Sequence, residues 1–280
     1  MQTADFLQVQ LTRWLPQVSV EIALICEMLK SNSTPVRAVA MWNGLLMRFP
    51  ALISFFLLCC GLASGCWEDV TTQVAATVLS VKGTVVFGMA EQNNFQPVTR
   101  ESRIHDGDMV RTSDGALLSL GLIPAALAQM SSNSEIKIEE LRISKDGNQT
   151  EGGMRSRSAR IRLNRGKITV LFTRRDRIGA LFAIITPSVT ITADSDCSFC
   201  VQSDGTTTRL TCARGNVYTS SSAQPSVAIG AGYFQQWPSG RAEPVAASDD
   251  AAAQIDVLDS LEIANQLREL QSGWQKRRPF

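Results

Sequence analysis

From about residue 74 to residue 240, short runs of apolar and β-branched residues alternate with turn-forming residues. The runs are Val78–Val81, Thr84–Phe87, Leu117–Leu120, Glu135–Ile138, Ala159–Leu163, Ile168–Phe172, Phe182–Thr186, Val189–Ala193, Phe199–Gln202, Thr208–Cys212, Val217–Thr219 and Val227–Ile229. Turn signals such as Asp106-Gly107, Asp114-Gly115 and Asp204-Gly205 separate them. Many short strands at close spacing predict a mostly-β domain. After Pro124, the segment Ala125–Gln129 fits either a short helical or an extended insertion.

Three of these runs open in the same way. Gly83, Gly166 and Gly215 each begin a Gly-x-apolar strand entry, where glycine permits a tight turn. Repeated strand and turn units favour stacked or rolled β structure (β-solenoid-like) over a parallel sheet covered by helices.

The last 40 residues follow a different pattern. A linker at 241–248 contains Ala and Pro, and Asp249 then begins a predicted helix that Gly273 ends. Its apolar positions at helical spacing are Ile255, Leu258, Leu261, Ile263, Leu267 and Leu270. We interpret this stripe as packed against the β domain, with docking of a partner as the alternative.

An apolar run near the front of the chain fits an export signal. Arg48 is followed by 15 residues without a charge, Phe49 to Ala63, and then by small residues up to Cys66. A membrane-spanning helix needs about 20 residues, so residues 47–65 predict a cleaved signal peptide. The alternative is a membrane helix at 49–63.

The end of that run, Leu62-Ala63-Ser64-Gly65-Cys66, resembles the lipobox of bacterial lipoproteins. The resemblance implies lipid on the Cys66 sulfur, although lipoboxes usually carry Leu where this chain has Ala63. An ordinary secretory signal cut nearby is the other interpretation. Residues 1–46, ahead of the signal, are interpreted as an upstream mis-start, with a short cytoplasmic segment as the rival. Residues 66–77 are a predicted linker.

Composition narrows the possible chemistry. The chain of 280 residues has a net charge of +1 and one histidine, His105, in a polar turn. It contains no phosphate-binding loop, no Gly-x-Ser-x-Gly elbow and no His-Glu-x-x-His sequence. We therefore predict no catalytic residues, no metal site and no cofactor.

A family resemblance follows from the order of several motifs. Gly83-Thr84-Val85 comes first, then the Gly-Asp-x-Val-x-Thr element Gly107–Thr112, then Leu163–Ile168, Ile185-Thr186-Pro187 and Gly215-Asn216-Val217. In this order they resemble the FecR domain over roughly residues 78–235, and we place the FecR-like domain at 78–240. One departure is that Asp196 and Cys197 replace the usual Gly-Thr.

Cys197, Cys200 and Cys212 flank the predicted turn at Asp204-Gly205. A two-residue hairpin loop there pairs Cys197 with Cys212, close enough for a disulfide in an oxidising compartment. Reduced core cysteines and three-thiolate metal binding are the alternatives, and Cys200 falls on the opposite face.

A local basic run is the remaining candidate site. It comprises Arg155, Arg157, Arg160, Arg162, Arg165, Lys167, Arg174 and Arg175. One interpretation is a site for an anionic partner, and the other is a solvated strand face. No aromatic residues are interleaved to stack bases, so nucleic acid is not expected.

The resemblances imply a non-enzymatic, envelope-anchored binding or scaffolding module that mediates protein–protein contact, including contact in signalling. Its expected place is the periplasmic side of a membrane, held by lipid on Cys66. The alternative is a single-pass sigma-factor regulator of the anti-sigma type, with the β domain in the periplasm.

Overall fold

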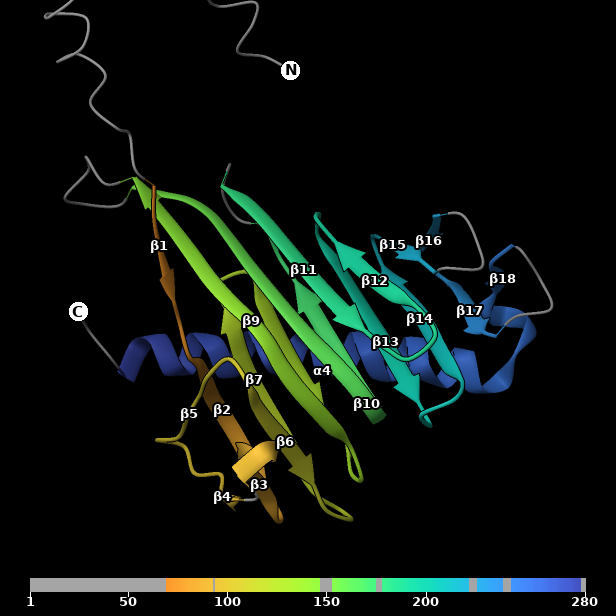
Figure 1. Cartoon of the computed structure of the whole chain (residues 1–280). Helices are drawn as coiled ribbons and strands as arrows, with labels where there is room; N and C mark the ends of the chain where they lie inside the picture. Colours follow the sequence, from red (N-terminus) through yellow and green to blue (C-terminus); the bar gives the residue numbers. More distant parts are fainter. Residues whose placement is uncertain are drawn as a thin grey trace, which may run out of the picture. The chain divides into compact units, whose positions relative to one another are not determined.

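The computed structural model describes residues 69–92, 94–146, 153–174, 178–221, 226–238 and 243–277. The predicted signal peptide, Cys66 and residues 1–46 lie outside the described residues, as does Arg175 of the predicted basic site. Figure 1 shows the described strands arranged in front of one long helix.

Sheet A has the strand order β4-β3-β6-β9-β10-β11-β12-β15-β16, and β1 extends the edge of β9 beyond β6. Its strands are β1 (Asp69–Gln73), β3 (Val85–Met89), β4 (Gln96–Pro97), β6 (Asp108–Thr112), β9 (Glu135–Asp146), β10 (Met154–Phe172), β11 (Gly179–Ile185), β12 (Thr190–Ala193), β15 (Asn216–Ser220) and β16 (Val227–Gly230). Only β10 and β11 pair in parallel among these described strands. Strand β1 lies inside the predicted linker, so the sheet begins before the expected boundary at residue 78.

Sheet B has the order β5-β2-β7-β8-β10-β13-β14-β17-β18. Its other strands are β2 (Ala76–Lys82), β5 (Arg103–Ile104), β7 (Leu117–Ile123), β8 (Ala126–Met130), β13 (Cys197–Ser203), β14 (Thr208–Arg214), β17 (Tyr233–Trp237) and β18 (Val245–Ala246). Short 3₁₀ turns occur at Ala90–Gln92 and Ala247–Asp249. Of the two options for Ala125–Gln129, the structure has the extended one, because most of this segment is strand β8.

The repeated glycines mark places where the chain changes sheet. Gly83 lies between β2 of sheet B and β3 of sheet A, and Gly215 lies between β14 and β15. At Gly166, β10 leaves its partners in sheet A and joins sheet B. Gly166 and Gly215 have φ values of 96° and 74°, and a Cβ atom there would overlap Ser134 or the carbonyl of Asp196. Only glycine fits these corners without strain.

The two sheets enclose one apolar core. Phe182 of sheet A lies between Phe172 and Phe199 of sheet B, with ring centroids 6.4 Å apart in both pairs. All three rings are fully buried. The inward side chains of both sheets belong to the same buried cluster, so the fold is a two-sheet β structure with a shared interior.

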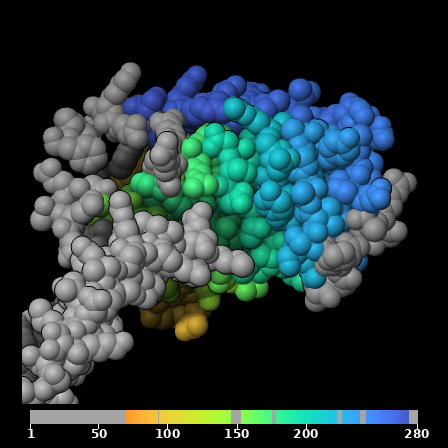
Figure 2. Space-filling model, turned by 90° about the horizontal axis from the view of Figure 1, so that it is seen from above, coloured from red at the N-terminus to blue at the C-terminus, as the bar shows by residue number. Residues whose placement is uncertain are grey.

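Helix α4 (Ala251–Arg277) forms a third layer on the outer face of sheet B. Figure 2 shows it running along one side of the molecule. Leu267 and Ala264 pack against Leu127 and Leu171, so sheet B is covered on both faces. This agrees with strands β8 and β13, which are buried at nearly every position.

The predicted mostly-β rolled fold with a C-terminal helix is confirmed. Two details of the helix were wrong. It continues past Gly273 to Arg277, and half of the predicted apolar stripe does not pack: Ile255, Leu258 and Leu261 are exposed by 58%, 68% and 39%. The packed face is instead Ala253, Asp256, Ser260, Ala264 and Leu267. Small side chains suit it because they let the helix approach the sheet closely.

Candidate functional site

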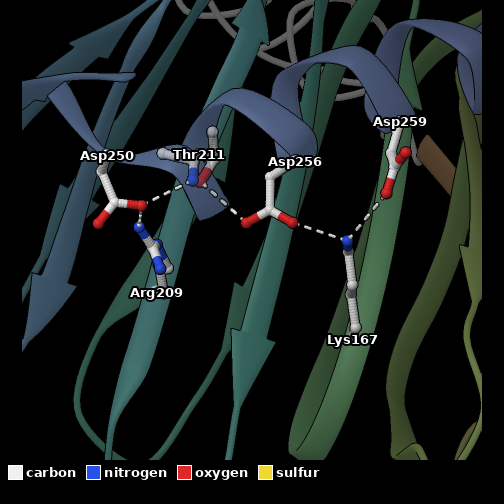
Figure 3. A network of polar contacts seen from close by, with 7 residues as sticks. Lys167, Arg209, Thr211, Asp250, Asp256 and Asp259 are labelled. Carbon is white, nitrogen blue, oxygen red and sulfur yellow. Dashed lines mark hydrogen bonds and ion pairs between the residues drawn. The ribbon is translucent and has the colours of Figure 1, made fainter. Parts of the chain in front are cut away.

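A polar network joins the first half of α4 to sheet B (Figure 3). We use this name for Lys167, Arg209, Thr211, Asp250, Asp256 and Asp259. Lys167 Nζ lies 2.7 Å from Asp256 Oδ1 and 3.6 Å from Asp259 Oδ2. The Asp256 side chain is only 9% exposed, and Thr211 Oγ1 lies 3.5 Å from its second oxygen. A buried carboxylate is thus paired with a cation that reaches it from the strand below.

The beginning of α4 is held by Asp250. Its carboxylate accepts a hydrogen bond of 2.8 Å from the backbone N–H of Ala253 and forms an ion pair with Arg209. The Arg209 guanidinium also lies 4.7 Å from the ring centroid of Phe234. The N–H of Ala253, and then the charge of Arg209, lower the pKa of Asp250. One carboxylate therefore both caps the helix and fixes it to β14.

Lys167 also lies close to a thiol. Burial acts to lower the pKa of Lys167, but the hydrogen bond and negative charge of Asp256 and the charge of Asp259 act against it, and the pKa is raised. Burial raises the pKa of Cys200 to about 12, which keeps it a neutral thiol under α4. This location fits the prediction that Cys200 lies on the face opposite to Cys197 and Cys212.

The sequence patterns did not predict this network. The signal available was Lys167 at the start of the apolar run Ile168–Phe172, together with Asp256 and Asp259 within the helical apolar pattern. Each charge interrupts an otherwise apolar surface, and the three meet where the two surfaces face each other.

The outer face of α4 has the opposite character. Ile255, Leu258 and Leu261, which we call the aliphatic stripe, are three large aliphatic side chains exposed next to one another at helical spacing. Since the inner face of α4 is fixed by the polar network, the stripe is held on a rigid support.

The predicted basic residues do not form a single surface. Arg162 pairs with Glu139 at 2.6 Å on the outer face of sheet A, where Arg111 likewise pairs with Glu135 at 2.8 Å. Arg160 is exposed and Arg157 is buried, while Lys167 lies under α4. Arg155, Arg165 and Arg174 are exposed. An anionic partner for these residues stays a prediction.

His105 lies exposed in the turn before β6, where its backbone N–H donates to Asp108 Oδ2 at 2.8 Å. Among the described residues, no group of three or more His, Cys, Asp or Glu side chains is arranged to hold a metal ion. No helix within the described ranges is both long and apolar enough to span a membrane.

The predicted register of the cysteine hairpin was wrong. Cys212 pairs with Phe199, and Cys197 pairs with Phe172 on the other neighbouring strand. The cause is a longer turn, in which the Asp204 carboxylate accepts hydrogen bonds from the backbone N–H groups of Thr206 and Thr207. The four-residue loop shifts the pairing by two positions. Cys197 and Cys212 are buried free thiols on the core side, and their disulfide stays a prediction.

Comparison with known proteins gives one family and one fold likeness. Residues 108–218 match the model of the family described as FecR protein. Two crystal structures, at 1.65 Å and 2.50 Å, of a candidate anti-sigma factor from Parabacteroides distasonis are similar to this chain at 12% and 11% identity, with TM-scores of 0.35 and 0.34. The likeness covers 49% of this chain and 57% of theirs, so it spans little more than half of those proteins. No curated protein matches the sequence. The matched region, 108–218, runs from β6 to β15.

Proposed function

We propose that this chain is a non-enzymatic binding module of the FecR type in the cell envelope, and that the aliphatic stripe of α4 contacts a protein partner. The observation that carries the proposal is the exposure of Ile255, Leu258 and Leu261 on a helix whose other face is fixed. Adjacent exposed aliphatic side chains on one helix face are typical of helix-mediated recognition. The FecR match over residues 108–218 supports a role in signalling.

The rigid support favours binding without rearrangement. Lys167 and Arg209 hold α4 through ion pairs with Asp256 and Asp250. Ordering a flexible helix would subtract from the affinity for a partner, and a helix that is already docked avoids that cost.

Photo-crosslinking in cells tests whether the aliphatic stripe contacts a protein partner. With the full chain carrying benzoylphenylalanine at position 258, we expect a discrete adduct of defined mass. Leu181 on β11 is the matched control, because it is an aliphatic residue exposed by 46% on sheet A. Adding Leu261→Glu should remove the adduct at 258. Identical adducts at 181 and 258, or none at 255, 258 and 261, would contradict the proposal.

Attachment to the envelope is proposed through lipid on Cys66. Metabolic labelling with a radioactive fatty acid is expected to mark the chain, and Cys66→Ser is expected to abolish the label. Label that survives this substitution rules out this attachment, leaving the stripe proposal to be judged by the crosslinks.

The second candidate is a single-pass sigma-factor regulator, which the same FecR match supports. It requires residues 1–46 to remain inside the cell and the apolar run at 49–63 to stay uncut. Sequencing the mature amino terminus separates the two: retention of Met1 favours the regulator, and a chain beginning at Cys66 favours the lipoprotein.

A further inference from the structure

An apolar pocket opens beside the C-terminal half of α4, away from both the polar network and the aliphatic stripe. Its volume is about 500 Å³, within the range of roughly 300–1,000 Å³ typical of small-ligand sites. The lining residues come from the β1–β2 corner, the β7–β8 hairpin, β9 and α4, and they include Val74, Ala75, Leu79, Leu127, Ile143 and Gln271. Four separate segments therefore surround one hollow.

Among the described residues, the lining has no charged side chain and no aromatic ring. The Thr77 hydroxyl donates to the carbonyl of Gly121 at 3.4 Å, so it has a partner within the wall. The Gln271 side-chain amide makes no hydrogen bond with the described residues. The hollow beside His105 is different, because Glu101, Arg103 and Asp108 line it. The apolar pocket offers dispersion and hydrophobic contact to its ligand, with one amide as a polar anchor.

The pocket exists because the inner face of α4 changes character after Leu267. Ala264 and Leu267 cover Leu127 and Leu171. One turn later the same face presents Gln271 instead of an apolar residue. Leu79, Val74 and Ile143 remain only partly buried as a result.

We propose that this pocket binds a saturated acyl chain, with the Gln271 amide donating to the carbonyl or carboxyl oxygen at its head. An uncharged aliphatic wall excludes polar metabolites, because desolvating their polar groups without partners costs free energy. The aliphatic side chains of the described lining favour a flexible chain over a stacked aromatic ligand.

The acyl chain proposed to occupy the pocket has two sources. One is a free fatty acid or the chain of a membrane phospholipid. The other is the lipid proposed on Cys66, since Val74 follows it by only eight residues, a tether of at most about 29 Å. Only the second source depends on the proposed lipid attachment.

The test uses two forms of the full chain, one with the native sequence, which carries the lipid proposed on Cys66, and one with Cys66→Ser. Each form is titrated with cis-parinaric acid. We expect saturable binding of one probe per chain and displacement by palmitate. Ala75→Phe fills the pocket from an irregular segment, and it should weaken binding at least tenfold. Gln271→Leu should weaken it about threefold by removing the anchor. Leu181→Ala, at an exposed aliphatic residue on β11 of sheet A, is the matched control and should bind as the parent does.

Val74→Gln is a second lining variant in case Ala75→Phe fails to fold, with circular dichroism as the check on both. Probe binding by the Cys66→Ser chain but not by the lipidated chain identifies the attached lipid as the occupant. Equal binding by both chains identifies an external lipid. No saturable binding to either chain, or unchanged binding in both folded lining variants, overturns the proposal. None of these outcomes changes the crosslinks expected at Leu258, so the proposed function is tested separately.

Discussion

The two halves of α4 meet sheet B through different chemistry. The first half is held by charges, with Asp250 on Arg209 and Asp256 on Lys167. The second half is held by aliphatic contacts of Ala264 and Leu267, and it ends beside an apolar pocket. Ion pairs need defined partners at defined distances, whereas aliphatic contacts tolerate some sliding.

The ion pairs therefore determine where α4 lies on sheet B, whereas the aliphatic contacts mainly hold it against the sheet. A helix packed by Leu267 alone would have neighbouring registers of similar energy. The Lys167–Asp256 pair selects one of them, because any other register leaves a buried carboxylate without its cation. We expect the aliphatic half to contribute more to stability, and it ends beside a pocket with room for a ligand.

The largest effect is expected in the aliphatic half. Leu267 is fully buried between α4 and sheet B, so Leu267→Ala should lower the free energy of unfolding by about 3 kcal/mol through lost burial and a cavity. Urea unfolding monitored by circular dichroism measures this. Leu258→Ala on the exposed face is the control and should change stability by less than about 0.5 kcal/mol. Equal effects of the two substitutions would mean that α4 does not dock as described.

Removing the cation of the polar half should have a smaller effect. Lys167→Met leaves Asp256 buried without a counter-charge, which costs about 3–5 kcal/mol at fully buried sites. We expect about 2 kcal/mol, because the Lys167 side chain is 23% exposed and water partly compensates. The same urea experiment measures it.

The double variant Lys167→Met/Asp256→Leu sharpens this comparison. Removing both charges should restore most of the lost stability, since no unpaired carboxylate remains. A double variant as unstable as the sum of the two single variants would show that the charges act independently, and the assignment of register to this pair would fail.

The pattern of strands could be predicted from the sequence, but the packing of the helix could not. The Gly-x-apolar echo at Gly83, Gly166 and Gly215 falls at changes of sheet, because a sharp corner needs a positive φ that the local sequence encodes. The face on which α4 packs was mispredicted, because periodicity assumes that apolar residues face inward. Sheet B presents Lys167 and Thr211 to the helix, so the buried face of α4 is small and partly charged.

Contacts between residues far apart in the chain could not be predicted from the sequence either. Lys167 and Asp256 are 89 residues apart, and nothing local links them. The hairpin register depended on one side chain, since the Asp204 carboxylate stabilises a four-residue turn where the Asp-Gly pair suggested two.

A pH effect of less than about 1 kcal/mol is expected from Asp250, whose side chain is 37% exposed and therefore screened. Its pKa is lowered from 3.8 on folding. Its contribution is therefore complete well above pH 3.8 and is lost as the pH falls below that value through the folded-state pKa. Urea unfolding from about pH 5 to about pH 2.5 should show a smaller loss in Asp250→Asn than in the parent. Asp204, whose pKa is also lowered, titrates in both proteins and cancels in the difference. A larger loss in the variant would contradict the sign.

The last expected effect is kinetic and reports on how α4 opens. Cys200 lies beneath α4, whereas Cys197 and Cys212 lie in the core between the sheets. Burial raises the pKa of Cys200 to about 12 and that of Cys212 to about 11, so each thiol reacts with iodoacetamide only after an opening event. Undocking of α4 exposes Cys200 alone. We therefore expect the Cys200 peptide to be alkylated first. Lys167→Met should speed that step about 30-fold if its cost of about 2 kcal/mol weakens the docking of α4.

A Cys197–Cys212 disulfide would withhold both peptides from alkylation until reduction. Alkylation of all three thiols at one rate would show that helix and sheets open together, and the distinction between the two halves of α4 would then have no dynamic consequence.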